Sequence, residues 1–163
     1  QPQDLADLIA YVRGEDRKPK SFPGNTPAVV VAGAEGTLEL QASNAEIYGD
    51  TLQYEETYRN LGFWGSINDH AVWKANVPVA GNYQVTLEYC CDDTIAGNLY
   101  RLESGANVLG GKVSGTGTWD RYRESKIGTL ALDAGEQRIV FRAGGPINQY
   151  LIDLRAIKLT PVK

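Results

Sequence analysis

The stretch "GNYQVTLEY" (residues 81–89) alternates between apolar and polar side chains, and this period of two constrains the fold more than any other feature. Successive side chains of a β-strand point to opposite faces, so the alternation predicts a strand with one buried face. The two faces are Tyr83, Val85, Leu87 and Tyr89 against Gln84, Thr86 and Glu88.

Two further stretches extend this pattern. "EQRIVFR" (136–142) alternates in the same way, and "LIDLRAIKL" (151–159) is apolar on both parities, which predicts a central strand. Turn sequences such as "PVAGNY" and "LDAGEQ" separate the strands. We therefore expect an all-β fold, an antiparallel jelly-roll β-sandwich over residues 36–163.

The first 35 residues have a different pattern. Residues 1–14 predict a short N-terminal helix, because Leu5, Leu8, Ile9 and Val12 recur at helical spacing before a glycine. Residues 15–35 are rich in charge, proline and glycine and are expected to form a linker.

Composition excludes several classes of partner. The formal charge of the 163 residues is −4, and no dense basic cluster points to nucleic acid. The apolar runs are too short for membrane insertion. The chain begins "QPQDL" without a methionine, so we expect a piece of a longer protein. A monomer is expected.

The sequence also lacks recognisable catalytic chemistry. His70 is the only histidine and is interpreted as a loop residue rather than a base, and the chain has too few His and Cys for a zinc site of those ligands. It carries no nucleophile-elbow or phosphate-loop motif. We expect no catalytic residues, with an enzyme kept as a third alternative.

The two cysteines, Cys90 and Cys91, are adjacent in "EYCCDD". They are either two small residues at a strand end, one facing in and one facing out, or a vicinal disulfide that stiffens the backbone. The disulfide would require an oxidising compartment.

Segments of the chain, taken in order, resemble a family 6 or family 35 carbohydrate-binding module. They are "LELQASNAEIYG" (38–49), "NLGFWGSINDHAVWKANVPVAGNYQVTLEY" (60–89), "VSGTGTWDRY" (113–122) and "LALDAGEQRIVFRAGGPINQYLIDLRAIKL" (130–159). The resemblance implies a galactose-binding-like β-sandwich that binds sugar without catalysis.

The resemblance also implies ligand-binding residues. Two aromatic rings in the family stack on a sugar, and the matching positions are Trp64 and Trp119, each with the alternative of packing inward. Trp73 is expected in the core. The family's cleft asparagine is replaced by Leu151, which puts its usual sugars in doubt. Other candidates for the cleft and its rim are Tyr122, Asn98, Asn148, Gln149, Tyr150, Asp92 and Arg121.

A structural calcium ion is a second feature that the resemblance implies. Glu39, Gln41 and Asp153 match its ligands, with Gln41 in place of an acid. The alternative is a hydrogen-bonded polar cluster between the first and last strands.

The helical start "DLADLIAYVRG" resembles the last helix of a bacterial cytochrome c domain, although a generic amphipathic helix is the alternative. The haem-attachment motif is absent, so no haem is expected here. A secreted or periplasmic, oxidoreductase-like bacterial parent protein is implied. The module would anchor that parent to a polysaccharide; alternatively, it is a structural domain that docks on other domains of the parent.

Overall fold

The computed structural model describes residues 5, 9 and 18–163. The helix expected over residues 1–14 lies outside them, apart from Leu5 and Ile9, which are helical and exposed. Its resemblance to a cytochrome helix therefore stays a prediction. In the described part, no helix has both the length and the apolar character that a membrane span requires.

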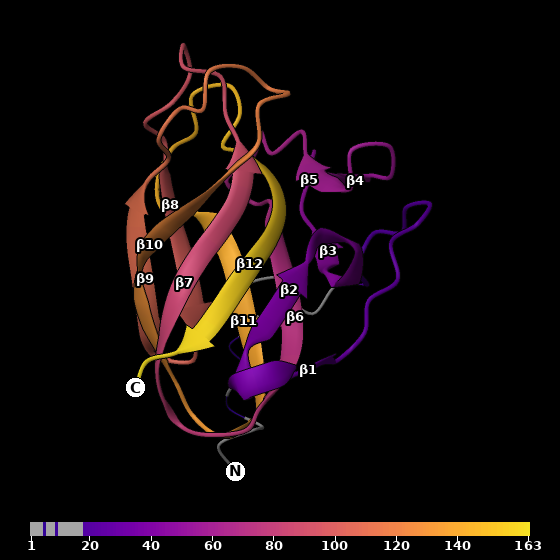
Figure 1. The fold of residues 1–163 in the computed structure, drawn as a ribbon. Coiled ribbons are helices and arrows are strands. Elements are labelled where there is room, and N and C mark those ends of the chain that lie inside the picture. Colours follow the sequence, from indigo (N-terminus) through magenta and orange to yellow (C-terminus); the bar gives the residue numbers. More distant parts are fainter. Residues whose placement is uncertain (1–4, 6–8, 10–17) are drawn as a thin grey trace.

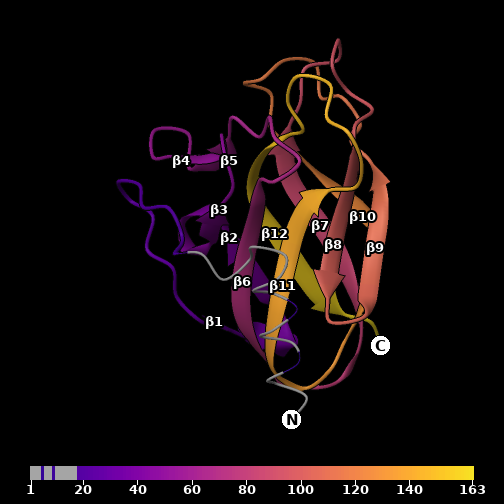
Figure 2. The ribbon, with the colours of Figure 1, turned by 180° about the vertical axis from the view of Figure 1, so that it is seen from behind.

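Two sheets pack face to face, as Figures 1 and 2 show from opposite sides. The sheet in front in Figure 2 has the order β1-β6-β11-β8-β9 with β3 beside β6, and the sheet in front in Figure 1 has the order β10-β7-β12-β5-β4 with β2 beside β12. The strands of the first are β1 (Val30–Val31), β3 (Glu46–Tyr48), β6 (His70–Val77), β8 (Leu99–Ser104), β9 (Asn107–Lys112) and β11 (Gly135–Ala143). Those of the second are β2 (Leu38–Gln41), β4 (Gln53–Glu55), β5 (Asn60–Gly62), β7 (Gly81–Cys90), β10 (Arg123–Leu132) and β12 (Asp153–Pro161). Two short 3₁₀ turns, η1 (Ala34–Gly36) and η2 (Ala42–Asn44), flank β2.

The alternating stretches form the strands that they predict. In β7, Tyr83, Val85 and Leu87 are buried against the other sheet. Strand β12 is central, because it pairs with β7 on one side and with β2 and β5 on the other. The expected β-sandwich is confirmed. Trp73 is fully buried in its core, as predicted.

The expected linker is the first correction. Its described part packs on the sandwich: β1 pairs in parallel with β6, and Lys20 forms an antiparallel bridge with Ile47. Asn25 is buried and donates hydrogen bonds to the carbonyls of Ser43 and Ala45. These long-range contacts place the start of the sandwich earlier than residue 36.

Three long loops gather at one end of the sandwich, the upper end in Figure 1. They are residues 91–98 after β7, residues 113–122 before β10 and residues 144–152 before β12. Strands β4 and β5 lie beside them. This end of the molecule therefore brings together the segments in which the sequence places its candidate aromatic residues.

Candidate functional site

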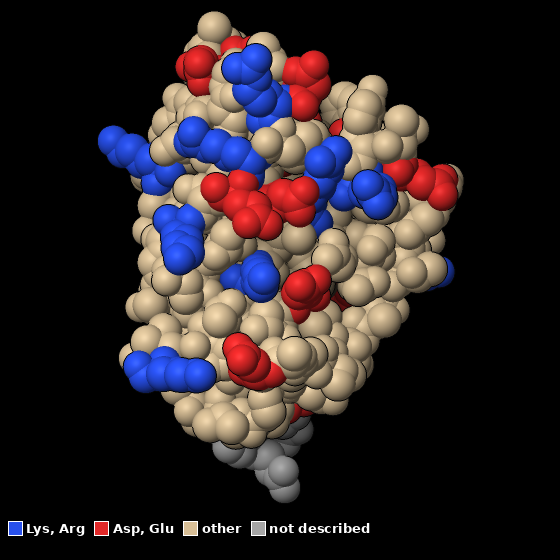
Figure 3. All heavy atoms as spheres, viewed as in Figure 1, with Lys and Arg blue, Asp and Glu red and all other residues tan. Residues whose placement is uncertain are grey.

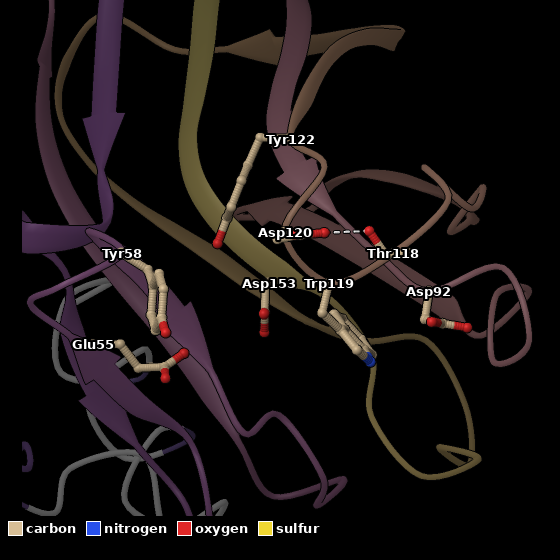
Figure 4. Close-up of a pocket in the computed structure, with 8 residues that line it drawn as sticks. All are labelled: Glu55, Tyr58, Asp92, Thr118, Trp119, Asp120, Tyr122 and Asp153. Carbon is tan, nitrogen blue, oxygen red and sulfur yellow. Dashed lines mark hydrogen bonds between the residues drawn. The ribbon is translucent and has the colours of Figure 1, made fainter.

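A groove of about 460 Å³ crosses the loop end of the sandwich over the start of β12. Figure 4 shows Asp153 at its centre, with Glu55 and Tyr58 on one side and Trp119 on the other. It is lined by Glu55, Tyr58, Asp92, Thr118, Trp119, Asp120, Tyr122 and Asp153. A second hollow of about 180 Å³ shares Glu55, Trp119 and Asp153 with it and adds Phe63 and Tyr150. We call the two together the Trp119 groove.

Three aromatic rings define the second hollow. The ring of Tyr150 stands edge-on to Trp119, with centroids 6.5 Å apart, and edge-on to Phe63, with centroids 6.4 Å apart. Phe63 and Tyr150 are exposed, whereas Trp119 is partly buried against the core. Such a cluster offers apolar ring surface to a ligand beside the carboxylates of Glu55 and Asp153.

The loop that carries Trp119 is held against the end of β7. The backbone N–H of Gly117 donates to a carboxylate oxygen of Asp93 at 3.0 Å, and the N–H of Asp93 donates to the carbonyl of Gly117. A Cβ on Gly115 would lie 2.1 Å from the same carboxylate, so only glycine fits there. The thiol of Cys90 donates to the carbonyl of Trp119 at 2.8 Å. The Gly-Thr run thus fixes the position of Trp119.

Trp64 is a correction, because it is not a wall of the groove. Its side chain is fully buried, its ring lies edge-on to Phe141 at 5.4 Å, and its Nε1–H donates to the carbonyl of Asp69 at 3.2 Å. The preceding residue, Phe63, has a positive φ of 57° and a 48% exposed side chain. The left-handed backbone at Phe63 redirects the chain, so that Phe63 lines the groove and Trp64 enters the core.

Asp69 explains why this loop holds its shape, and the sequence analysis did not single it out. Its buried carboxylate accepts hydrogen bonds from the backbone N–H groups of Asp50, Thr51 and Ser66 at 2.6–2.9 Å and from the Thr51 hydroxyl at 2.7 Å. A carboxylate with this many donors ties together segments that are distant in sequence. Its only signal in the sequence was a polar residue just before an apolar strand.

Asn98 acts on the groove from beneath. It is buried, its Nδ2 donates to the carbonyls of Asn148 and Tyr150, and its Oδ1 accepts the N–H of Asn148 at 2.9 Å. These bonds clamp the loop that presents Tyr150. Asn98 is therefore a positioning residue and not the ligand contact that the sequence suggested.

The other loop residues that the sequence suggested as ligand contacts lie in different places. Gln149 has a φ of 62° and lines a neighbouring hollow of about 670 Å³, which shares Phe63 and Tyr150 with the Trp119 groove. Asn148 and Arg121 are exposed, and neither is among the residues that line the Trp119 groove. Of the residues expected before β12, only Tyr150 lines the groove.

Asp92 and Tyr122 line the groove as expected. Hydrogen bonds from the hydroxyl and N–H of Thr94 lower the pKa of Asp92, so it is an anion at neutral pH. Burial, followed by the neighbouring Cys90, raises the pKa of Tyr122, so its hydroxyl keeps its proton. The guanidinium of Arg155 lies 3.5 Å from the Tyr122 ring centroid.

Asp153 is a carboxyl group of the groove with a strongly raised pKa. Burial, followed by the nearby carboxylate of Glu55, raises its pKa to about 7. The Cys90 thiol lies 4.0 Å from its carboxylate. Glu55 and Tyr58 were not anticipated, because nothing in their local sequence marks them.

The two cysteines are free thiols, which corrects the proposed vicinal disulfide. Cys91 belongs to the core between the sheets, whereas Cys90 contacts the Trp119 carbonyl under the loop. Adjacent side chains at a strand end point to opposite faces, so the reading of one inward and one outward residue is the right one. The loop covers the outward residue, which explains why both are buried and why burial raises both thiol pKa values.

The expected calcium ligands are not brought together. Glu39 and Gln41 are exposed on β2, where the Gln41 amide donates to Glu39 at 3.3 Å, and Gln41 lies opposite Ala156. Asp153 is three residues further along β12, about 10 Å at 3.3 Å per residue, and lines the groove instead. Within the described residues, no group of three or more His, Cys, Asp or Glu could hold a metal ion.

His70 is not part of the groove. Its ring stacks on Tyr48 with centroids 5.0 Å apart, and its Nδ1 lies 2.9 Å from the carbonyl of Asn68.

The groove combines aromatic surface, carboxylates and hydroxyls, a set suited to binding polar ligands that have an apolar face.

No known family profile matches the chain, and no curated protein matches its sequence. The fold, however, has solved counterparts among family 35 and family 6 carbohydrate-binding modules. A family 35 module from Clostridium thermocellum has a TM-score of 0.63 and 20% identity, over 77% of this chain and 98% of that one. The module CBM6cm-2 from Cellvibrio mixtus lichenase 5A, solved with cellotriose, has a TM-score of 0.61 and 19% identity, over 77% and 97%.

A third counterpart has a different role. The mosquito-larvicidal Cry4Aa toxin from Bacillus thuringiensis has a TM-score of 0.64 and 11% identity, over 84% of this chain and 25% of the toxin chain. At such identities the likeness shows the β-sandwich fold alone. The function has to be argued from the groove.

Proposed function

We propose that this chain is a non-catalytic carbohydrate-binding module that binds a polysaccharide in the Trp119 groove. The observation that carries the proposal is the set of rings of Trp119, Phe63 and Tyr150 around the carboxylates of Glu55 and Asp153. A sugar ring has an apolar face of C–H groups for an aromatic surface and hydroxyls that donate to carboxylates. The structural neighbours that are carbohydrate-binding modules support this proposal.

The groove suits a chain rather than a single sugar. The larger hollow between Tyr58 and Trp119 continues into the one between Trp119 and Phe63, because both share Glu55, Trp119 and Asp153. Successive units of an oligosaccharide could then occupy both hollows. In this proposal, the module holds a larger secreted or periplasmic bacterial protein on its polysaccharide.

The experiment is a binding panel of soluble and insoluble polysaccharides, followed by titration calorimetry with oligosaccharides of the best ligand. Trp119→Ala and Phe63→Ala should each weaken binding about tenfold, since an aromatic contact contributes about 0.5–1.5 kcal/mol beyond its buried area. Val79→Ala is the control, because Val79 is 67% exposed and lies outside the groove.

The alternative is a structural module that docks on another domain through Phe63 and Tyr150, both of which are exposed. Docking and sugar binding differ in the response to free oligosaccharide. Absence of binding across the whole panel, with the protein folded, would overturn the carbohydrate proposal and favour docking.

A further inference from the structure

The charged side chains that line the Trp119 groove all have the same sign. They are Glu55, Asp92, Asp120 and Asp153, and no lysine or arginine is among the lining residues. On the face formed by β7, β10 and β12 the charges are mixed, because Figure 3 shows acidic and basic side chains side by side there. The lining of the groove differs from this face in being anionic alone.

Arg155 borders the groove but forms its ion pair with a carboxylate outside it. Arg155 holds its guanidinium over the Tyr122 ring, donates from Nε to the carbonyl of Tyr58 at 2.9 Å, and pairs with Glu88 at 3.7 Å. Arg155 thus contacts two residues that line the groove, Tyr58 and Tyr122, and its ion pair is with Glu88, which is not a lining residue. The carboxylate of Asp153 has no ion pair among the interactions of the described residues.

Burial and the neighbouring carboxylate of Glu55 disfavour the charge of Asp153. The titratable side chains around it are Glu55 from β4, Cys90 and Cys91 from the end of β7, Tyr122 from the loop before β10, and Arg155 of its own strand. Glu55 accepts a hydrogen bond from the amide of Asn60 at 3.0 Å. Two carboxylates that share one small hollow repel each other, and a hydroxyl donor leaves that repulsion in place.

We infer that the Trp119 groove selects glycans that carry free amino groups, with a protonated amine between Glu55 and Asp153 and the sugar ring against Trp119. This inference rests on the proposed carbohydrate binding. An ammonium group removes the repulsion between the carboxylates, and the faces of neighbouring aromatic rings also attract cations. A uronic acid would add a third negative charge to the same hollow and is excluded.

The experiment compares three pentasaccharides with the same β-1,4-linked glucose-type backbone, which differ only at carbon 2: a hydroxyl, an N-acetyl group or a free amine. Titration calorimetry is run at about 0.15 M salt, to screen non-specific attraction, and at about pH 6, where the amine is protonated. Asp153 releases its proton when the ammonium group binds, because a neighbouring cation favours the carboxylate. The amine form should bind at least tenfold more tightly than the other two.

Matched variants test whether the preference for the amine form depends on the carboxylates of Glu55 and Asp153. Asp153→Asn and Glu55→Gln should each lower the ratio of the affinity for the amine form to the affinity for the hydroxyl form about tenfold. Asp133→Asn makes the same charge change on an exposed residue between β10 and β11 and should have no effect. If Asp133→Asn lost as much affinity for the amine form, the attraction would be a non-specific effect of net charge, and the inference would be wrong.

The other outcomes separate this inference from the proposed function. If neutral sugars bind as tightly as the amine form, or more tightly, carbohydrate binding stands and the selectivity for amines is wrong. If no glycan of the whole panel binds, both proposals are wrong.

Discussion

Two loops of this protein have similar sequences, but the tryptophan of one is buried in the core and that of the other lines the groove. The loop after β5 carries "GFWGS" and the loop before β10 carries "GTGTWD", and both place a tryptophan among glycines at the same end of the sandwich. Trp64 is fully buried and bonded to the carbonyl of Asp69, whereas Trp119 stands in the wall of the groove.

The difference lies in what holds each loop. The carboxylate of Asp69 pulls the first loop inward through donors on Asp50, Thr51 and Ser66. Asp93 and Cys90 hold the second loop by its backbone and leave the indole of Trp119 outside these bonds. A tryptophan in a loop is therefore exposed or buried according to the anchor of the loop, and the anchor is distant in sequence.

The largest expected effect is the loss of stability on removing the buried tryptophan, Trp64. Trp64→Ala should lower the free energy of unfolding by about 3–5 kcal/mol, because it empties a core position beside Phe141. Phe63→Ala, one residue earlier, should cost less than about 1 kcal/mol, since Phe63 is exposed. Urea unfolding of both variants checks this. Equal losses would mean that the two side chains do not differ in burial as described.

The second effect concerns the carboxyl group beneath the Trp119 loop. The pKa of Asp153 is raised from 3.8 to about 7 in the folded state, so between about pH 4 and 7 the folded protein binds more protons than the unfolded chain. Stability from this group is therefore lost as the pH rises through that window. Three pKa units at about 1.4 kcal/mol each set an upper limit of about 4 kcal/mol.

Asp153→Asn keeps the neutral shape and should raise the melting temperature at about pH 8, with no gain at about pH 3, where Asp153 is protonated in both states. Thermal melts across pH check the sign. Asp133→Asn, on the exposed turn between β10 and β11, is the control without such a pH-dependent gain. A constant shift at every pH would contradict the raised pKa.

The third effect tests the exposed side of the comparison. Trp119→Ala should weaken polysaccharide binding about tenfold, yet reduce stability by only about 1–2 kcal/mol, because the ring is partly buried and the loop is held by its backbone. Calorimetric titration and urea unfolding of the same preparation give both numbers. A loss of stability as large as that of Trp64→Ala would make Trp119 a core residue.

The smallest effect concerns calcium. Because β2 and the start of β12 hold Glu39 and Asp153 apart, we expect Ca²⁺ or EDTA to shift the melting temperature by less than about 1 °C. A ligand of the folded state raises stability by mass action, so differential scanning fluorimetry detects it directly. A clear shift that disappears in Glu39→Gln would restore the calcium site that the family resemblance implies.

Much of this protein follows from its sequence alone. The period-two alternation of residues 81–89 specifies a strand with one buried face, and residues 151–159 contribute a strand in the interior of a sheet, as predicted. Trp73 is buried because it stands on an apolar parity. These are local properties, since the pleat of a strand assigns each side chain to a face without reference to distant residues.

Only the tertiary structure decided the composition of the groove. Glu55, Trp119 and Asp153 come from separate parts of the chain and meet because β4, the loop before β10 and β12 converge at one end of the sandwich. The same convergence makes Asn98 a clamp, moves Asp153 away from Glu39, and covers Cys90. These outcomes depend on contacts between residues far apart in sequence, which the alternation of apolar and polar side chains along one strand does not encode.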